Sequence, residues 1–384
     1  MPEKQNIQER FPFGQVQLAR LLFDPEHSGC FAGSFFPPIF ISKSFSSAMT
    51  CLNTCVKIIF TFIAMTATAY SQSTPDSTGW IEQVDPAFSV LVKKDAPIRI
   101  IAEGLDWCEG PLWIESKKML LFSDVPQNII YKWTEAGGKE TYLIPSGYTG
   151  TVARGGETGS NGLLLSPQGQ LVICQHGDRR MARMNAPLNK PKPDFSTLAG
   201  GYQGKKFDSP NDAVYHRNGE LYFTDPPYGL EQREKDPHKE APYQGVYKVS
   251  KEGKITLLTD TLTRPNGLAF FPGHTKLLIA NSDPEKPYWY IFDINRQGLP
   301  VNGKIFYDAT SASKEAAGMP DGLKIDRNGN VFATGPGGVW IFDRTGKLLG
   351  KIRIKSLASN CSFSADEKTL YVTADMYVLK VSLR

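Results

Sequence analysis

The sequence predicts an all-β protein, a six-bladed β-propeller, and three observations indicate this fold class. Six segments of similar pattern repeat along the chain at intervals typical of propeller blades. The 384 residues include 35 glycines and 27 prolines, and many short apolar runs end in Asn-Gly, Asp-Gly or Pro, as expected where tight turns join short strands. The composition, 41% hydrophobic and 21% charged, is typical of a globular protein.

Each repeat begins with a polar anchor residue that is followed by an apolar strand. The anchors are Glu109, Asn161, Asn211, Asn266, Asp321 and Asn360, at spacings of 52, 50, 55, 55 and 39 residues. A second apolar strand starts ten or eleven residues after every anchor, and third strands such as Val246-Tyr-Lys-Val follow. These intervals match a four-stranded blade, and six such blades close a ring without free sheet edges.

The last repeat is too short for four strands of its own. We therefore expect the final blade to borrow a strand from residues near 98–103, Ile98-Arg-Ile-Ile-Ala, which would fasten the ring. The propeller is accordingly predicted over residues 98–384, and residues 72–97 are predicted to be an N-terminal linker.

Residues 1–71 are predicted to be an upstream extension plus a signal peptide. The segment that begins at Met49 contains Lys57, then an apolar run too short to span a bilayer, then the small-residue pattern Ala67-Thr-Ala69. This order is typical of a secretory signal, so we expect translation to start at Met49 and the mature protein to be secreted or periplasmic, with no membrane contact after cleavage. A buried hydrophobic hairpin is the alternative for this segment.

Charge and cysteine content narrow the possible partners and the sources of stability. The net charge is +4 and the charged residues are dispersed, so no nucleic-acid footprint is visible. The six cysteines form no Cys-x-x-Cys pair. We expect the three in the body of the protein, Cys108, Cys174 and Cys361, to be buried, unpaired thiols.

The six anchors are expected to meet at the centre of the propeller. The innermost strand of each blade lines the central channel, so residues at one repeat phase become neighbours. All six anchors carry oxygen donors, which calcium prefers, whereas a zinc site would call for His or Cys. Asn-Gly and Asp-Gly are also common turn formers, but a turn does not explain Glu109 in Glu-Gly-Pro or Asn360 in Asn-Cys at the same phase.

Around these anchors the chain resembles the SMP-30/gluconolactonase/LRE family of six-bladed propellers, over about residues 98–384. The resemblance is carried by Glu109-Gly-Pro, Ser209-Pro-Asn211-Asp, Arg264-Pro-Asn266-Gly-Leu and Met319-Pro-Asp321-Gly-Leu. Three further segments, Cys174-Gln-His176, Phe223-Thr-Asp-Pro-Pro-Tyr228-Gly and Asn360-Cys-Ser-Phe, resemble the bacterial gluconolactonase branch.

The resemblance implies one divalent cation, calcium, in the channel and the hydrolysis of a sugar lactone. It implies Glu109, Asn211, Asn266 and Asp321 as metal ligands, with Asp321 also the catalytic proton acceptor and donor. One position departs from the family pattern. In animal members, an arginine two residues before the position of Asn211 contributes to recognition of the sugar. In this chain the residue at that position is Ser209.

Four further residues are candidates for substrate binding. Asn161 and Asn360 are expected to meet substrate or water rather than the metal. His176 is expected either to face the channel mouth or to belong to a solvated charged loop with Asp178 to Arg180. Tyr228 and the charged insertion 231–239 are expected to cover the pocket or to form an ordinary exposed loop.

Gly155-Gly-Glu-Thr-Gly159 lacks the Gly-Lys-Ser/Thr of a phosphate loop and is interpreted as a strand connection.

Other functions remain open on the sequence. Neither Gly-x-Ser-x-Gly nor His-Glu-x-x-His occurs, so serine esterases and zincins lack their usual motifs. The same oxygen ring could serve a metal-dependent aryl ester or phosphotriester hydrolase. A non-catalytic propeller that binds a ligand is the alternative from another class, since fold alone does not establish chemistry. The sequence indicates no oligomeric state.

Overall fold

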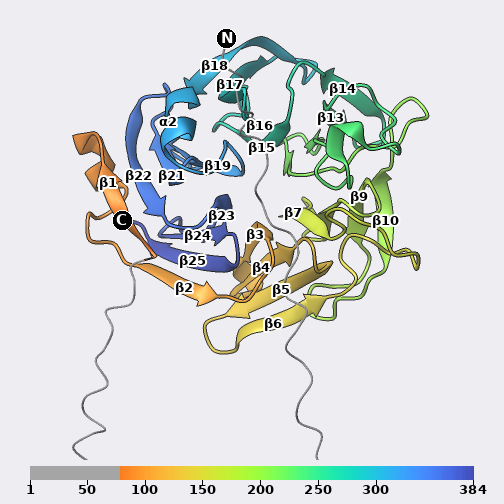
Figure 1. Ribbon diagram of the computed structural model, residues 1–384, viewed down its shortest axis with the longest axis horizontal. Coiled ribbons are helices and arrows are strands. Elements are labelled where there is room, and N and C mark those ends of the chain that lie inside the picture. The colour runs from red at the N-terminus through yellow and green to blue at the C-terminus, as the bar shows by residue number, and fades with distance from the viewer. Residues whose placement is uncertain (1–77) are drawn as a thin grey trace, which may run out of the picture. The chain divides into compact units, whose positions relative to one another are not determined.

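Residues 78–384, which the computed structural model describes, form six antiparallel sheets arranged as the blades of a propeller (Figure 1). This confirms the predicted fold class. The predicted upstream extension and signal peptide, with Cys30, Cys51 and Cys55, lie outside the described residues. No helix within residues 78–384 is long and apolar enough to cross a membrane.

The first strand of each blade lies nearest the axis, and later strands lie progressively outward. Blade 1 contains β3 (Cys108–Ile114), β4 (Met119–Asp124), β5 (Ile129–Thr134) and β6 (Gly138–Leu143). Blade 2 contains β7 (Ser160–Leu165), β8 (Leu171–Gln175), β9 (Arg180–Met184) and β10 (Phe195–Ala199). Blade 3 contains β11 (Ala213–Tyr215), β12 (Leu221–Asp225), β13 (Gly245–Val249) and β14 (Ile255–Thr259).

The other three blades follow the same order from the axis outward. Blade 4 contains β15 (Pro265–Phe270), β16 (Lys276–Asp283), β17 (Lys286–Ile294) and β18 (Pro300–Asp308). Blade 5 contains β19 (Leu323–Ile325), β20 (Val331–Gly335), β21 (Gly338–Phe342), β22 (Leu348–Ile354) and β1 (Gly79–Gln83). Blade 6 contains β23 (Ala358–Phe363), β24 (Thr369–Ala374), β25 (Tyr377–Ser382) and β2 (Ile98–Ala102). Short helices are η1 (Pro86–Val90), η2 (Glu115–Lys117), η3 (Arg233–Lys235) and α2 (Thr310–Glu315).

The N-terminal strand β2 closes the ring as the sequence predicts. It pairs antiparallel with the C-terminal strand β25, with Ile98 opposite Val381 and Ile100 opposite Leu379, and Figure 1 shows the two strands side by side. A second strand, β1, was not anticipated, because it lies in the stretch expected to be a linker. It pairs with β22 and extends blade 5 to five strands.

The core of the propeller lies between neighbouring blades. Six clusters of buried hydrophobic side chains are present in the described part of the chain, and each joins two adjacent blades. Trp289 of blade 4, for example, packs against Trp340 and Phe342 of blade 5. Cys108, Cys174 and Cys361 are buried, free thiols in these clusters, as expected.

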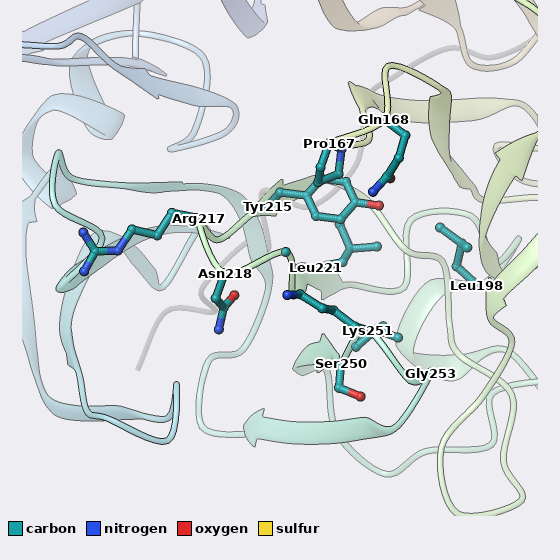
Figure 2. Close-up of a pocket in the computed structure, with 12 residues that line it drawn as sticks. Pro167, Gln168, Leu198, Tyr215, Arg217, Asn218, Leu221, Ser250, Lys251 and Gly253 are labelled. Atoms are coloured by element: carbon teal, nitrogen blue, oxygen red, sulfur yellow. The ribbon is translucent and has the colours of Figure 1, made fainter.

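The long connections gather at one end of the propeller. In an antiparallel meander the inner strand begins, and the second strand ends, at the same end of the blade. The connections 144–159, 226–244 and 309–322 therefore lie at the end where the anchors are. The short turns 166–170, 216–220 and 250–254 lie at the opposite end and surround a cavity of about 480 Å³ (Figure 2). That cavity is remote from the anchors.

Candidate active site

All six anchors lie at the start of an inner strand or just before it, and surround the axis. Glu109, Asn161, Asn211, Asn266 and Asn360 are buried, with at most 4% of each residue exposed. Asp321 is half-buried, although its Oδ1 atom is fully enclosed. The inner strands contact one another around the ring, so the repeat phase does bring these residues to one place.

Irregular pairing turns the anchors toward the axis. The register between the first and second strands shifts immediately after the anchor in blade 1 (Glu109/Leu112), and similar shifts occur beside the anchors of blades 2, 4 and 6. A β-bulge bends a strand locally and re-aims its side chains. The anchors can therefore point inward although regular strands would alternate their side chains between two faces.

A glycine follows the anchor in four blades because adjacent inner strands approach each other too closely for a side chain. A Cβ atom on Gly110, Gly162, Gly267 or Gly322 would lie 2.1 Å from Asn161 O, 2.6 Å from Asn211 O, 2.4 Å from Asp321 O or 2.0 Å from Asn360 Cγ, respectively. These glycines lie in or directly before inner strands. Close packing at the axis therefore explains them, and Gly110 in addition has a left-handed backbone with φ +55°.

Gly267→Ala is expected to destabilise the protein and to disturb the ring. The new Cβ would meet the backbone of Asp321 and lie 2.7 Å from Gly322 Cα, and backbone atoms cannot move aside as a flexible side chain can. Overpacking of this kind costs about 1–3 kcal/mol or more of unfolding free energy. Urea unfolding would measure the loss, with Gly200→Ala as control, since its Cβ would meet only Thr197 Cγ2 at 3.4 Å. Equal stability of the two variants would contradict this account.

Buried hydroxyl groups fix the backbone beside the anchors from one blade to the next. Ser123 Oγ donates to the Asn161 carbonyl (2.9 Å), and Thr334 Oγ1 donates to the Ser359 carbonyl (2.9 Å). Ser359 Oγ in turn donates to the Cys108 carbonyl across the ring closure (2.6 Å). These bonds link the backbones of neighbouring blades beside the anchors.

Several oxygens of the ring face the axis without a hydrogen-bond donor. Asn161 Oδ1, Asn266 Oδ1 and Asp321 Oδ1 are buried and accept no hydrogen bond from any described residue. Asn266 Nδ2 is held by Ser282 Oγ at 3.0 Å, which leaves its Oδ1 as the free atom. A buried acceptor without a partner costs about 1–3 kcal/mol. Three such oxygens at one centre could accept hydrogen bonds from water or a ligand, or coordinate a cation.

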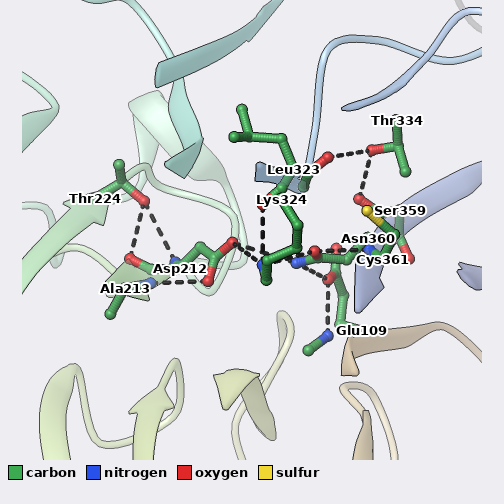
Figure 3. Close-up of polar contacts among 12 residues, drawn as sticks. Glu109, Asp212, Ala213, Thr224, Leu323, Lys324, Thr334, Ser359, Asn360 and Cys361 are labelled. Carbon is green, nitrogen blue, oxygen red and sulfur yellow. Dashed lines mark hydrogen bonds and ion pairs between the residues drawn. The ribbon is translucent and has the colours of Figure 1, made fainter. Parts of the chain in front are cut away.

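A seventh residue of the centre, Asp212, was not predicted from the sequence. Asn360 Nδ2 lies 3.3 Å from Glu109 Oε2 and 3.4 Å from Asp212 Oδ2, and so joins the two carboxylates (Figure 3). Lys324 Nζ lies 3.8 Å from Asp212 Oδ2. Asp212 stands at the repeat position that glycine occupies in four other blades. That departure from the repeat is the signal that could have identified it.

The centre carries more negative than positive charge. Burial raises the pKa of Glu109 to about 8, and the charges of Asp212 and Glu157 act in the same direction. Burial, followed by the charges of Glu109, Asp212 and Glu157, holds the pKa of Asp321 well above its usual value, although the Asn266 amide lowers it. Four carboxyl groups thus influence one another where Lys324 is the nearby cation. A bound cation would relieve this repulsion.

His176 and Tyr228 lie at the same end of the propeller as the ring. His176 is fully buried, so the solvated-loop alternative does not describe it, and its Nδ1 lies 3.3 Å from Glu157 Oε2. Glu157 comes from the 144–159 connection, so the glycine-rich segment is a strand connection, as predicted, that also delivers a carboxylate. Burial and then the charge of Asp321 raise the pKa of Tyr228. The Tyr228 hydroxyl therefore lies close enough to Asp321 for the two groups to interact electrostatically. Arg233 of the charged insertion lies 5.8 Å from the Tyr228 ring centre.

The chemistry of the donors fits a hard divalent cation. In the described range, no group of three or more His, Cys, Asp or Glu side chains is placed to hold a metal by those residue types alone. A cation at the axis would therefore depend on amide oxygens as well as carboxylates. Calcium accepts such mixed oxygen sets. The unpartnered oxygens of Asn266 and Asp321 and the carboxylate of Glu109 are of that kind.

Comparisons with known proteins agree with the fold. The profile of the SMP-30/Gluconolactonase/LRE-like region matches residues 107–375. A gluconolactonase from Zymomonas mobilis subsp. mobilis is 35% identical over 348 residues, which span 87% of this chain and 97% of that protein. The solved structure of a gluconolactonase from Xanthomonas campestris is similar with a TM-score of 0.68 at 28% identity, and covers 79% of this chain and 95% of that chain.

A more distant structure supports the fold alone. The calcium-binding protein regucalcin from Agrobacterium tumefaciens is similar with a TM-score of 0.57 at 16% identity, and covers 74% of this chain and 94% of that chain. The matched profile, in contrast, spans most of the chain and contains all six anchors. The chain therefore belongs to the SMP-30/gluconolactonase/LRE-like family.

Proposed function

We propose that this protein is a lactonase that opens a sugar lactone by hydrolysis, and that it depends on one divalent cation, Ca²⁺. The observation that carries the proposal is the ring of buried oxygens with three unpartnered acceptors. Glu109, Asn211, Asn266 and Asp321 would hold the cation. When bound, it supplies Lewis-acid polarisation of the lactone carbonyl and compensates the negative charge of the tetrahedral oxyanion.

Asp321 would handle the proton of the attacking water. Its carboxylate accepts that proton as the C–O bond to water forms, and returns it to the ring oxygen as the ester bond breaks. Burial and neighbouring carboxylates raise the pKa of Asp321 and a nearby cation lowers it, so its basicity depends on both influences. Its half-buried position, with one oxygen enclosed and the residue partly accessible, suits contact with both cation and water.

The neighbouring side chains would bind and orient the sugar. Tyr228 keeps its hydroxyl protonated because its pKa is raised, so it can donate a hydrogen bond to a substrate oxygen. His176 and Asn161 each have an enclosed polar atom without a hydrogen-bond partner. The Asn360 amide lies between the carboxylates of Glu109 and Asp212, so its Nδ2 is used there.

The relatives support the substrate class. Ser209, however, restricts which residues can recognise the sugar. Gluconolactonases are among the proteins most similar to this chain over nearly their whole length. Ser209 is fully buried, donates to the Pro226 carbonyl and accepts from Gly229 N at 2.8 Å. An arginine would not fit there, so the sugar hydroxyls must be recognised by other residues.

A substrate panel tests this proposal against a second hydrolase chemistry. Purified protein with added Ca²⁺ would be given aldonolactones, aryl esters and phosphotriesters, and each rate would be compared with the uncatalysed rate. Turnover of aldonolactones well above the other two classes is the expected result. Turnover confined to aryl esters or phosphotriesters would reassign the site, and binding without any turnover would favour a non-catalytic propeller.

His176→Gln is expected to lower kcat for a sugar lactone by about 10-fold or more, because an enclosed imidazole beside Glu157 that would orient the sugar is replaced by a more flexible amide. Steady-state kinetics would check this. His274→Gln is the matched control, since His274 contacts His216 and Phe270 at the opposite end of the propeller. An unchanged kcat in His176→Gln would remove this residue from the site.

A further inference from the structure

We propose that a second pocket, beside the axial site, binds the carboxylate or phosphate group of a small polar molecule. The pocket has a volume of about 750 Å³ and lies between the connections 144–159, 176–179 and 226–244, at the anchor end of blades 2 and 3. We call it the arginine pocket, after three of the side chains that line it, Arg154, Arg179 and Arg180. The proposal does not depend on lactone hydrolysis.

Two of these arginines are held by neutral groups. Arg154 Nη1 donates to the Gly177 carbonyl at 2.7 Å, and its Nη2 donates to the Gly229 carbonyl. Arg179 Nε donates to the Phe207 carbonyl at 2.6 Å, and its Nη1 donates to the His238 carbonyl at 2.9 Å. Carbonyl groups fix the orientation of a guanidinium but do not cancel its charge. Both cations therefore remain available to an anion.

Arg179 is built into the pocket with one donor unused. Only 8% of the residue is exposed, and its Nη2 is enclosed and has no hydrogen-bond partner among the described residues. Its backbone φ is +58°, a left-handed conformation that is uncommon for a residue with a side chain. The nearest carboxylate oxygen, Oε1 of Glu240, is 3.9 Å from Nη1. A buried, unpaired guanidinium donor indicates that the pocket takes an acceptor.

The remaining charges leave a positive surplus around the two arginines. Arg180 is neutralised within the wall, because it pairs with Asp178 at 2.9 Å. Asp236 accepts hydrogen bonds from the backbone amides of Gln232 and His238 but keeps its negative charge. Lys206 also lines the pocket and makes no ion pair with a described residue, and Glu231 adds one unpaired carboxylate. The lining therefore holds four cations against three carboxylates, a surplus of one positive charge. Burial and the charge of Arg179 lower the pKa of Arg154, as expected for two adjacent cations.

The arginine pocket also borders a residue of the axial site. Arg154 links the carbonyls of Gly177, which follows His176 in the sequence, and Gly229, which approaches His176 in space. A Cβ on Gly229 would lie 2.8 Å from His176 Cβ. An anion bound by Arg154 would therefore lie next to the two backbone segments that contact His176.

Isothermal titration of the full chain with D-gluconate, inorganic phosphate and D-glucose tests the proposal. Gluconate or phosphate should bind with an affinity that falls as salt rises, and neutral glucose should not share this site. Arg154→Gln should weaken the anion about 10-fold and Lys206→Gln about 3-fold, while Glu231→Gln should strengthen it about 3-fold. Lys251→Gln, in the cavity at the opposite end, is the matched control and should change nothing.

The three ligands and the variants separate the possible outcomes. Binding of gluconate alone would assign a carboxylate ligand, and binding of phosphate alone a phosphate ligand; both support the pocket. Lys206 is exposed, so Lys206→Gln keeps the test valid if Arg154→Gln fails to fold. Absence of binding by both anions would overturn the proposal. So would anion binding that is lost in Asp321→Asn and unchanged in Lys206→Gln and Glu231→Gln, because the anion would then occupy the axial site.

Discussion

Asp321→Asn is expected to lower kcat/KM for a sugar lactone by about 10²–10⁴-fold, the contribution typical of a positioned acid–base group. The substitution keeps the size of the side chain and its enclosed Oδ1, but it removes the negative charge and the proton acceptor. Progress curves with D-glucono-1,5-lactone, corrected for spontaneous opening, would measure the effect. Calcium affinity should fall in the same variant, since one carboxylate ligand is lost.

Asp260→Asn is the matched control for this substitution, because Asp260 is exposed and makes no ion pair with a described residue. It should leave kcat/KM unchanged. If Asp321→Asn retained full activity, neither the proton-transfer role nor the ligand role of Asp321 could stand.

Glu109→Gln is expected to have opposite effects on the free energy of unfolding with and without calcium. With calcium at 100 times its dissociation constant, the wild-type chain should gain about 2.7 kcal/mol, and the variant should lose most of that gain. Without calcium, the variant should be the more stable protein, because burial, and then the charges of Asp212 and Glu157, disfavour the Glu109 carboxylate. Thermal or urea unfolding of both proteins in chelator and in calcium would measure the two effects.

The pH dependence of the chelated protein gives an independent readout. The pKa of Glu109 is raised from 4.5 to about 8, so the folded chain binds a proton that the unfolded chain releases. Its contribution to stability is therefore lost as the pH rises from about 4.5 to 8, and Glu109→Gln should lack this contribution. Glu103→Gln, at an exposed position in the connection between β2 and β3, is the control. Identical curves for wild type and Glu109→Gln would contradict the crowding of carboxylates at the axis.

The repeat was sufficient to predict the ring but not its local geometry. Anchors about 50 residues apart fix the number of blades and bring Glu109, Asn266 and Asp321 to one place. The short last repeat also predicts the borrowed strand, which is β2 in the structure. The additional strand β1 could not be foreseen, because a single five-residue edge strand has no counterpart in the other blades.

Contacts that depend on departures from the repeat were missed. Asp212 occupies the repeat position that holds glycine in four other blades, so the repeat gives no reason to expect a carboxylate there. Glu157 lies in a long connection that shares no phase with the anchors, and only the fold brings it to His176. Asn-Gly pairs were open to a turn interpretation because sequence does not show the close approach of Gly267 to Asp321.

The central claim, a cation-dependent lactonase on the propeller axis, is tested most directly by one activity measurement. The purified protein would be stripped of metal by a chelator, assayed for D-glucono-1,5-lactone opening above the spontaneous rate, and assayed again after calcium is restored. The proposal predicts loss of turnover on chelation and recovery with calcium at about one ion per chain, with no recovery in Asp321→Asn. Undiminished turnover by a metal-free protein would contradict it.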